Sequence, residues 1–404
     1  MPVTFLLDLD DTLLKSNMEA FIPEYFSALS TALADVVKPE EMLPALMGGT
    51  KLMMVNEDPA HTLKDVFDGY FYPRLTCDQV ILQDRINHFY DDIFPGLKRL
   101  TQPRPEAVEF VDWAVATGNR VTVATNPFFP LKAILHRLRW AGLSPEDYPF
   151  ELISSYETFH FTKAFGSYFS EFVGQIGWPD GPIVMVGNDF NMDLVPAKKA
   201  GLPVFWINEK YDDQHNDIPQ GSFSDLRNWI ENTDPERLLI NWNTLESVLT
   251  ALVSTPAILD ALTSHLPDFT WDLMDNDEGK TLRNLICLLG ETEKNINLPG
   301  WKRLLSENKP FHREVPEEID VSSNDCGNRR GRENLQEFIV SRKSIIGLLK
   351  NNVTSWDGKI WVNPTQMTTW KELLVKTAVN DKKQIQGIWS LLKSAGQKSN
   401  IVVH

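Results

Sequence analysis

The sequence has little positive charge, few cysteines and no long apolar run, and each shortage argues against a class of protein. It carries 39 Lys and Arg against 55 Asp and Glu, a formal net charge of −16. That balance argues against nucleic acid as a partner, because proteins that bind phosphate backbones usually present a basic face. The three cysteines (Cys77, Cys287 and Cys326) lie far apart with no metal-binding spacing. We expect ordinary thiols in a reducing compartment.

Membrane and export signals are missing as well. No stretch of 18 apolar residues occurs, and the N-terminus shows no basic segment followed by an apolar run. We therefore expect a cytoplasmic protein with no membrane partner. The 42% hydrophobic content predicts well-filled cores, and a length of 404 residues favours two domains.

The first half of the chain alternates apolar runs with helical patterns. A helix-rich segment with several Pro and Gly breakers separates the first run from the second. Strands joined through helices form crossover units, so this alternation predicts a parallel sheet whose carboxyl edge binds ligands. The predicted strands lie at 3–7, 120–126, 151–154, 182–189 and 202–207.

The polar segment after about residue 210 predicts a closing helix at 224–231 and a linker, and from residue 242 onward the pattern is helical with no evident strand run. Four amphipathic helices are the economical basis for a four-helix bundle. The predicted fold class is therefore α/β plus all-α, with domains at 1–235 and 240–404. The four predicted helices lie roughly at 243–266, 279–296, 332–351 and 366–395.

In the opening segment VTFLLDLDDTLLKSN, residues 3–17, an apolar strand is followed directly by three carboxylates, those of Asp8, Asp10 and Asp11. Burying a carboxylate is costly unless it is paired or binds a metal. Asp8 and Asp10 are two residues apart and share a face where the strand ends, so both can bind one Mg²⁺ ion. Such an ion would leave Asp8 ionised as a nucleophile, and Asp10 can hold a proton for the leaving group.

Other strand ends supply matching groups. Thr125 and Asn126 can hold phosphate oxygens, and Lys163 can neutralise the nucleophile and the phosphoryl group. Asp189 and Asp193, one helical turn apart in VGNDFNMD, can complete the Mg²⁺ shell. Together these residues suit phosphoryl transfer, which needs in-line positioning and charge neutralisation.

In their order and spacing, DLDDT, TN, a lysine before a helix and VGNDFNMD resemble the four motifs of the haloacid dehalogenase (HAD) superfamily. The resemblance implies a Rossmann-like core formed by 1–14 and 104–235. It implies a helical cap of the C1 type at about 15–103 that chooses the substrate. It further implies an aspartyl-phosphate on Asp8 and general acid/base catalysis by Asp10.

The resemblance also implies that Thr125 contacts the phosphate, that Lys163 stabilises charge and that the acidic fourth motif binds Mg²⁺. Two positions depart from the usual motifs. Gly187 is followed by Asn188 and only then by Asp189, so which of the two meets the metal stays open. Lys163 is followed by alanine, where proline is frequent.

Residues 240–404 resemble the DinB-like four-helix bundle family through STPAILDALTSHLPD, EGKTLRNLICLLGETE, LLSENKPF and TAVNDKKQIQGIWSLLK. Many members bind a divalent metal through one histidine on the second helix and two on the fourth. The corresponding positions here are Leu288, Asn380 and Gln384, which are poor ligands. The resemblance thus implies a bundle without its metal, kept for structure, association or shaping of the site.

The sequence therefore predicts an Mg²⁺-dependent HAD hydrolase that acts on a small-molecule phosphate ester, a phosphomonoester. Asp10 favours phosphate chemistry, because the dehalogenase branch usually lacks the second aspartate. Two alternatives stay open. One is a non-catalytic binding or scaffold protein, and the other is a HAD hydrolase of another bond, C–halogen or phosphonate.

Overall fold

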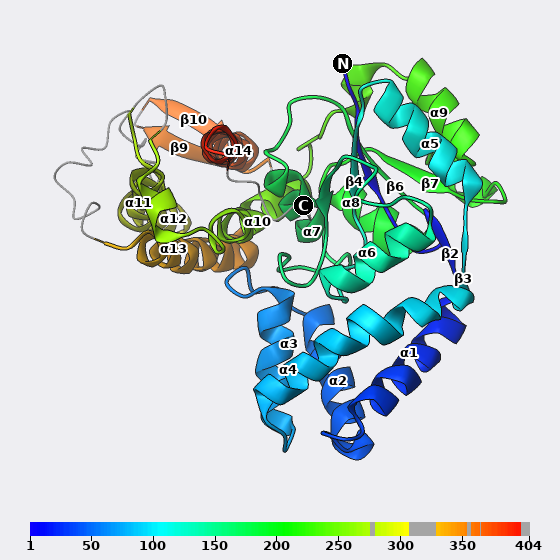
Figure 1. Cartoon of the computed structure of the whole chain (residues 1–404). Coiled ribbons are helices and arrows are strands. Elements are labelled where there is room, and N and C mark those ends of the chain that lie inside the picture. The colour runs from blue at the N-terminus through cyan, green and yellow to red at the C-terminus, as the bar shows by residue number, and fades with distance from the viewer. Residues whose placement is uncertain (275–278, 307–328, 354–356, 364, 397–404) are drawn as a thin grey trace.

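A six-stranded parallel sheet forms the centre of the first half of the chain, in the order β5-β4-β1-β6-β7-β8 (Figure 1). The computed structural model describes residues 1–274, 279–306, 329–353, 357–363 and 365–396; Cys326 and most of LLSENKPF lie outside them. The five predicted strands are confirmed, whereas β8 was not predicted because it has only two residues. The strands are β1 (Thr4–Leu7), β4 (Arg120–Val123), β5 (Phe150–Ile153), β6 (Ile183–Gly187), β7 (Val204–Ile207) and β8 (Gln220–Gly221).

Helices cover both faces of this sheet, and β1 contributes to both cores. Phe5 and Leu7 pack with one set of helices, and Leu6 packs with the other, as the two-residue period of a strand requires. The first face carries α5 (Pro105–Ala116), α6 (Leu131–Trp140) and α9 (Phe223–Asn232). The second face carries α7 (Gly166–Gln175) and α8 (Val195–Lys199).

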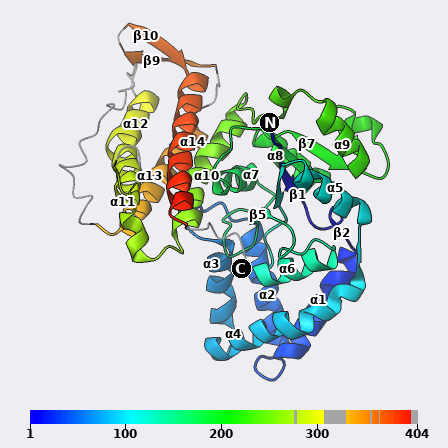
Figure 2. The ribbon, with the colours of Figure 1, turned by 45° about the horizontal axis from the view of Figure 1, so that its top comes forward.

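The C-terminal helices continue the core of the second face. Helix α10 (Leu245–Thr263) packs on α7 and also on the helices that follow it (Figure 2). Because both sides are covered, α10 is apolar nearly all round. It is the one helix in the described part of the chain with the length and composition to cross a membrane, yet 78% of that segment is buried in the protein.

The all-α part contains the four predicted helices, and it also contains helix α12 (Leu298–Ser306) and a β-hairpin, which were not predicted. A hairpin of β9 (Lys359–Asn363) and β10 (Gln366–Thr369) precedes the last helix, so the expectation of no strand is wrong here. Their sequences, KIWVN and QMTT, begin and end in polar residues and so lack the apolar runs that predicted the strands of the parallel sheet. The remaining helices are α11 (Leu282–Thr292), η8 (Glu293–Asn297), α12 (Leu298–Ser306), α13 (Gly331–Asn352) and α14 (Trp370–Ser394).

A helical insert leaves the sheet domain after β1 and returns before α5. Its two connections, β2 (Leu14–Ser16) and β3 (Thr101–Pro103), pair as antiparallel strands, so the chain leaves and re-enters side by side. In Figure 1 the insert lies below the sheet domain. Its elements are α1 (Met18–Leu33), α2 (Pro39–Met54), α3 (Leu63–Phe71), η1 (Tyr72–Arg74), α4 (Gln79–His88), η2 (Phe89–Ile93) and η3 (Phe94–Leu100).

The cysteines differ from one another. Cys77, in the insert, is a free thiol, whereas Cys287 on α11 is disulfide-bonded. The expectation of ordinary thiols is therefore wrong for Cys287.

Candidate active site

Three strands end side by side at the carboxyl edge of the sheet. β1 runs parallel between β4 and β6 and is in register with both. Asp8 directly follows β1, Thr125 lies just beyond β4, and Asn188 directly follows β6. Residues far apart in the sequence thus meet at one edge, which is where parallel sheets bind ligands.

Lys163 joins two of the predicted carboxylates. Its Nζ donates to Asp8 Oδ1 at 2.5 Å and to Asp193 Oδ1 at 2.6 Å, and all three side chains are buried. The backbone N–H of Lys163 donates to Asn126 Oδ1 at 3.3 Å, which ties the lysine loop to the end of β4. A lysine, its nucleophile candidate and a second carboxylate therefore form one buried cluster.

Burial and neighbouring charges both shift the pKa values of Lys163 and Asp193. Burial alone would lower the pKa of Lys163, but Asp193 and Asp8 outweigh it and raise the pKa. Burial raises the pKa of Asp193 and the neighbouring Asp8 carboxylate adds to this, while Lys163 and the Asp189 N–H oppose it. Asp193 consequently depends on Lys163 to stay ionised.

The fourth motif separates its two candidate metal ligands. Asp189 is exposed, and its Oδ1 accepts from Asn191 N at 2.8 Å and Met192 N at 3.0 Å, so it caps η4 (Phe190–Leu194). Asn188 is half-buried, and its Oδ1 accepts from the Thr12 hydroxyl at 3.0 Å. Of these two side chains, that of Asn188 faces the segment that follows Asp8.

Close packing requires a glycine at position 187. A Cβ there would lie 2.2 Å from Asp193 Oδ2, which accepts from Asp189 N at 2.9 Å. Any side chain at this position would push Asp193 away from Lys163.

Asp10 belongs to a separate pair. Its Oδ1 accepts from the Ser16 hydroxyl at 2.8 Å and is ion-paired with Nη2 of Arg137, a buried residue of α6. The turn that carries it has Asp11 at φ 56°, a left-handed conformation that Asp tolerates better than most residues. Arg137 was not predicted.

Thr125 is fixed through its backbone. Its carbonyl accepts from the hydroxyls of Ser154 and Tyr168, both at 2.8 Å, and those two hydroxyls lie 2.9 Å apart. Thr125 itself is buried. Neither Ser154 nor Tyr168 was predicted, and both set the position of the β4 end.

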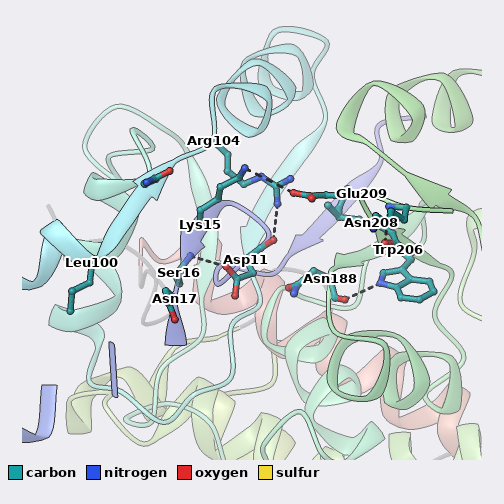
Figure 3. Close-up of a pocket in the computed structure, with 13 residues that line it drawn as sticks. Asp11, Lys15, Ser16, Asn17, Leu100, Arg104, Asn188, Trp206, Asn208 and Glu209 are labelled. Atoms are coloured by element: carbon teal, nitrogen blue, oxygen red, sulfur yellow. Dashed lines mark hydrogen bonds and ion pairs between the residues drawn. The ribbon is translucent and has the colours of Figure 1, made fainter. Parts of the chain in front are cut away.

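A cavity of about 660 Å³ opens next to the connections of the insert (Figure 3), and Asn188 lines it, whereas Asp8, Thr125 and Lys163 do not. Its wall includes Ser16, which donates to Asp10, and Asn188, whose carbonyl accepts from Trp206 Nε1 at 2.9 Å. Both connections of the helical insert line it, so it lies between the insert and the sheet domain. The lining residues are Asp11, Lys15, Ser16, Asn17, Leu100, Gln102, Arg104, Asn188, Trp206, Ile207, Asn208, Glu209 and Lys210.

The four predicted metal-binding carboxylates do not form one cluster. Asp8 and Asp193 share Lys163, Asp10 is paired with Arg137, and Asp189 caps its own helix. Within the described ranges no group of three His, Cys, Asp or Glu could hold a metal ion. Oxygen donors for Mg²⁺ remain at the ends of β1 and β6, in Asp8 and Asn188. This small set fits an ion that keeps several waters.

Arg137 left a readable signal in the sequence. It lies three or four residues from Ala133, Ile134 and Ala141, which are all buried, so a charged residue stands on an apolar face. Buried arginines are rare without a partner. A charged residue on the apolar face of an otherwise amphipathic helix therefore indicates a buried ion pair.

The C-terminal helices carry their own buried charges. Arg342 on α13 donates through Nη2 to Asp381 Oδ1 of α14 at 3.1 Å and also pairs with Glu293 of η8. Burial opposes the charge of Arg342, but Asp381 and Glu293 raise its pKa. Asn380 is exposed and Gln384 is half-buried, so the polar centre of these helices is formed by other residues than those positions.

Residues 3–201 match the family model described as haloacid dehalogenase-like hydrolase. This range holds every strand-end residue described above. Residues 3–201 therefore form a haloacid dehalogenase-like hydrolase domain.

Solved structures similar to this chain include a HAD phosphatase from Thermococcus onnurineus, with 20% identity over 58% of this chain and 99% of that chain and a TM-score of 0.36. A 2-haloacid dehalogenase from Pseudomonas syringae pv. Tomato has 21% identity over 57% and 99%, with a TM-score of 0.40. YfiT from Bacillus subtilis, described as a probable metal-dependent hydrolase with an unusual four-helix bundle topology, has 18% identity over 39% and 90%, with a TM-score of 0.33. No curated protein matches the chain.

Proposed function

We propose that this protein is an Mg²⁺-dependent phosphatase that hydrolyses a small phosphomonoester through an aspartyl-phosphate on Asp8. The observation that carries the proposal is the position of Lys163, whose Nζ donates to both Asp8 and Asp193 at the carboxyl edge of the sheet. A fixed cation at this place offsets the charge of the nucleophile and of the phosphoryl oxygens that approach it.

The remaining roles follow from position. Asp10 is placed two residues beyond Asp8, next to the insert, and acts as the general acid/base towards the leaving group. Thr125 and Asn126, at the end of β4, contact the phosphate together with Lys163. Asp193 holds Lys163 in place through the 2.6 Å contact.

Asp8 and Asn188 are the residues that would hold Mg²⁺. When bound, the ion supplies positive charge to the phosphoryl oxygens. This arrangement differs from the predicted four-carboxylate set, because the side chains of Asp10 and Asp189 have other partners. With one carboxylate and one amide, the site would bind Mg²⁺ weakly on its own, and the substrate phosphate would strengthen it.

The helical insert acts as the cap, and residues 240–404 are a DinB-like bundle without the metal histidines. The buried Arg342 occupies its polar centre as a fixed cation between Asp381 and Glu293. Metal analysis of the full chain tests this: stoichiometric zinc or nickel that survives dialysis against a weak chelator would contradict a metal-free bundle.

The test of the proposed reaction is release of phosphate from an aryl phosphate by the full chain with Mg²⁺. Asp8→Asn keeps the size of the side chain and removes the nucleophile, so we expect turnover to disappear while circular dichroism stays unchanged. Unchanged turnover would refute the assignment. A wild-type chain inactive on a broad panel of phosphate esters would favour the scaffold alternative. Activity on haloacids or phosphonates alone would favour another bond type.

A further inference from the structure

The lysine loop, residues 156–163, is contacted by three parts of the chain. Its last residue is fixed at the active site, where Lys163 donates to Asp8 and Asp193 and its backbone N–H donates to Asn126. The helical insert contacts the same loop, and so do helices α7 and α10. Whatever holds this loop therefore sets the position of the lysine charge at Asp8.

The insert holds the loop through hydrogen bonds to backbone carbonyls. The N–H of Leu63, at the start of α3, donates to Phe159 O at 2.7 Å. Asn56 Nδ2 donates to His160 O at 2.8 Å. The first N–H groups of a helix have no partner within it, so the loop carbonyl satisfies one of these donors. Water can replace both bonds when the insert moves away, because intramolecular and water-mediated hydrogen bonds differ little in free energy.

The insert has to move for a substrate to reach the nucleophile. Asp8, Thr125 and Lys163 are at most 6% exposed, and none of them lines the cavity in Figure 3. The insert contacts the lysine loop and packs Phe21 against Arg137, so it covers this edge of the sheet. While the insert is displaced, its hydrogen bonds to the lysine loop are broken.

His160 fixes the loop to elements outside the insert. Its Nδ1 lies 2.8 Å from Glu171 of α7, and its Nε2 lies 3.1 Å from Asp260 of α10. The backbone N–H of His160 also donates to the Glu171 carboxylate. Helices α7 and α10 share one core, so neither partner moves with the insert. The imidazole and Glu171 are fully buried, where a broken ion pair leaves an uncompensated charge and is therefore costly.

We infer that His160 is a positioning residue for Lys163: it keeps the lysine at Asp8 while the insert opens to admit substrate. The inference rests on the proposed function, in which Lys163 offsets the charge of Asp8 and of the phosphoryl oxygens. His160 acts through the lysine, three residues further along the loop. Because Asp260 belongs to α10, the C-terminal helices support the active site through this ion pair.

The test replaces Asp260, because removing His160 would leave Glu171 buried without its cation. Asp260→Asn keeps an oxygen that accepts from His160 but removes the charge, and Asp260→Ala removes both. Glu246→Gln is the matched control. It breaks another ion pair between α10 and the hydrolase domain, from Lys199 Nζ to Glu246 Oε1 at 3.1 Å, which is exposed. This pair lies about 20 Å from Asp260 along the helix.

Amide hydrogen exchange of the full chain without substrate measures the loop directly and needs no turnover. We expect residues 156–163 to exchange faster than wild type in Asp260→Asn and faster still in Asp260→Ala. The increase in Asp260→Ala should be roughly tenfold or more, the size of a lost charge-assisted hydrogen bond. Glu246→Gln should exchange at the wild-type rate in this segment.

The pH dependence of turnover is a readout that a merely structural role would not move. Glu171 and Asp260 are the charged groups in contact with the ring, and they raise the pKa of His160 to about 10 against the effect of burial; the insert presents the neutral Asn56. Losing one of two carboxylates should lower this pKa by about 1–3 units. A neutral imidazole bonds to its partners less strongly, so kcat on an aryl phosphate with Mg²⁺ should fall at lower pH in Asp260→Asn than in wild type. Glu246→Gln should keep the wild-type profile.

An unchanged exchange rate of the loop in Asp260→Ala, or a wild-type pH profile in Asp260→Asn, would overturn the inference. If Asp260→Ala does not fold by circular dichroism, the exchange rate in Asp260→Asn decides. Faster exchange in a chain that hydrolyses no phosphate ester would retain the positioning of Lys163 and reject the phosphatase. Turnover with unchanged loop exchange would retain the phosphatase and reject the role of His160.

Discussion

His160 connects the hydrolase domain to helix α10: its Nε2 lies 3.1 Å from Asp260 Oδ2, and its Nδ1 lies 2.8 Å from Glu171 Oε1. The imidazole and the Glu171 carboxylate are fully buried. A carboxylate on each side of the ring stabilises the doubly protonated imidazolium. The loop before Lys163 is thereby ion-paired with a helix residue 100 positions further along the chain.

His160 should stay protonated through neutral pH. Burial opposes its charge, but Glu171 and Asp260 outweigh that effect and raise the pKa to about 10. Because the folded pKa lies above the unfolded value, the stability from this charge is complete below about pH 6.5 and is lost as pH rises towards 10. An NMR titration of the imidazole signals should show one histidine that is still protonated at pH 8. The variant His160→Asn or His160→Gln lacks this signal and so identifies it. A signal that titrates near pH 6.5 would contradict this.

The two residues of the fourth motif should respond in opposite ways to exchange of amide and carboxylate. Asp189→Asn should keep activity within a few-fold of wild type, because the side chain is exposed and Asn also caps helices well. Asn188→Asp adds a carboxylate beside Asp8 and should lower the Mg²⁺ concentration that gives half-maximal activity. A tenfold rise of that concentration in Asp189→Asn would show that Asp189 meets the metal instead.

Removing Lys163 should destabilise the fold as well as stop turnover. Lys163→Met leaves Asp8 and Asp193 buried without their cation, which costs about 3–5 kcal/mol in unfolding free energy. Asp193→Asn should cost less, since the amide oxygen can still accept from Lys163. Lys198→Met is the control, because Lys198 forms an exposed pair with Asp217 and should change stability by about 1 kcal/mol or less. Urea denaturation in a chelator compares the three, and equal losses would reject a special role of Lys163.

Gly174 should be essential for the packing of α7 on α10. A Cβ at this position would lie 2.2 Å from Ile258 Cδ1 and 2.6 Å from its Cγ1. Gly174→Ala should therefore cost about 1–3 kcal/mol. At Gly387 on α14 an added Cβ meets nothing within 4 Å, so Gly387→Ala should stabilise the helix by about 0.5–1 kcal/mol. Thermal unfolding measures both, and a neutral Gly174→Ala would mean that α7 and α10 can separate freely.

Much of the fold was legible in local patterns. Buried parallel strands such as β1 and β6 are nearly continuous apolar runs. Such a run can be recognised in the sequence whatever its neighbours in the sheet are. The hairpin β9–β10 was missed because its strands begin and end in polar residues and are not apolar runs of this kind. The shared core of α7 and α10 was also missed, since the apolar surface of a helix does not indicate which helix packs against it.

The candidate site divides in the same way. The residue types at the strand ends pointed to Asp8 and Lys163, and the structure brings these two into contact. Their roles in catalysis stay predictions. What could not be read was the choice of partner: Asp10 pairs with Arg137, and Asp189 turns away to cap a helix. Several carboxylates of equal chemistry compete for few cations, and local sequence cannot rank them.

Residue chemistry and hydrophobic period were enough to place an acidic edge on a parallel sheet and to name the kind of ligand it suits, because both act over a few neighbouring residues. Which acid meets which base, and which helix closes over which face of the sheet, depended on distances between residues 30 to 155 positions apart in the chain. Those distances exist only once the chain has packed.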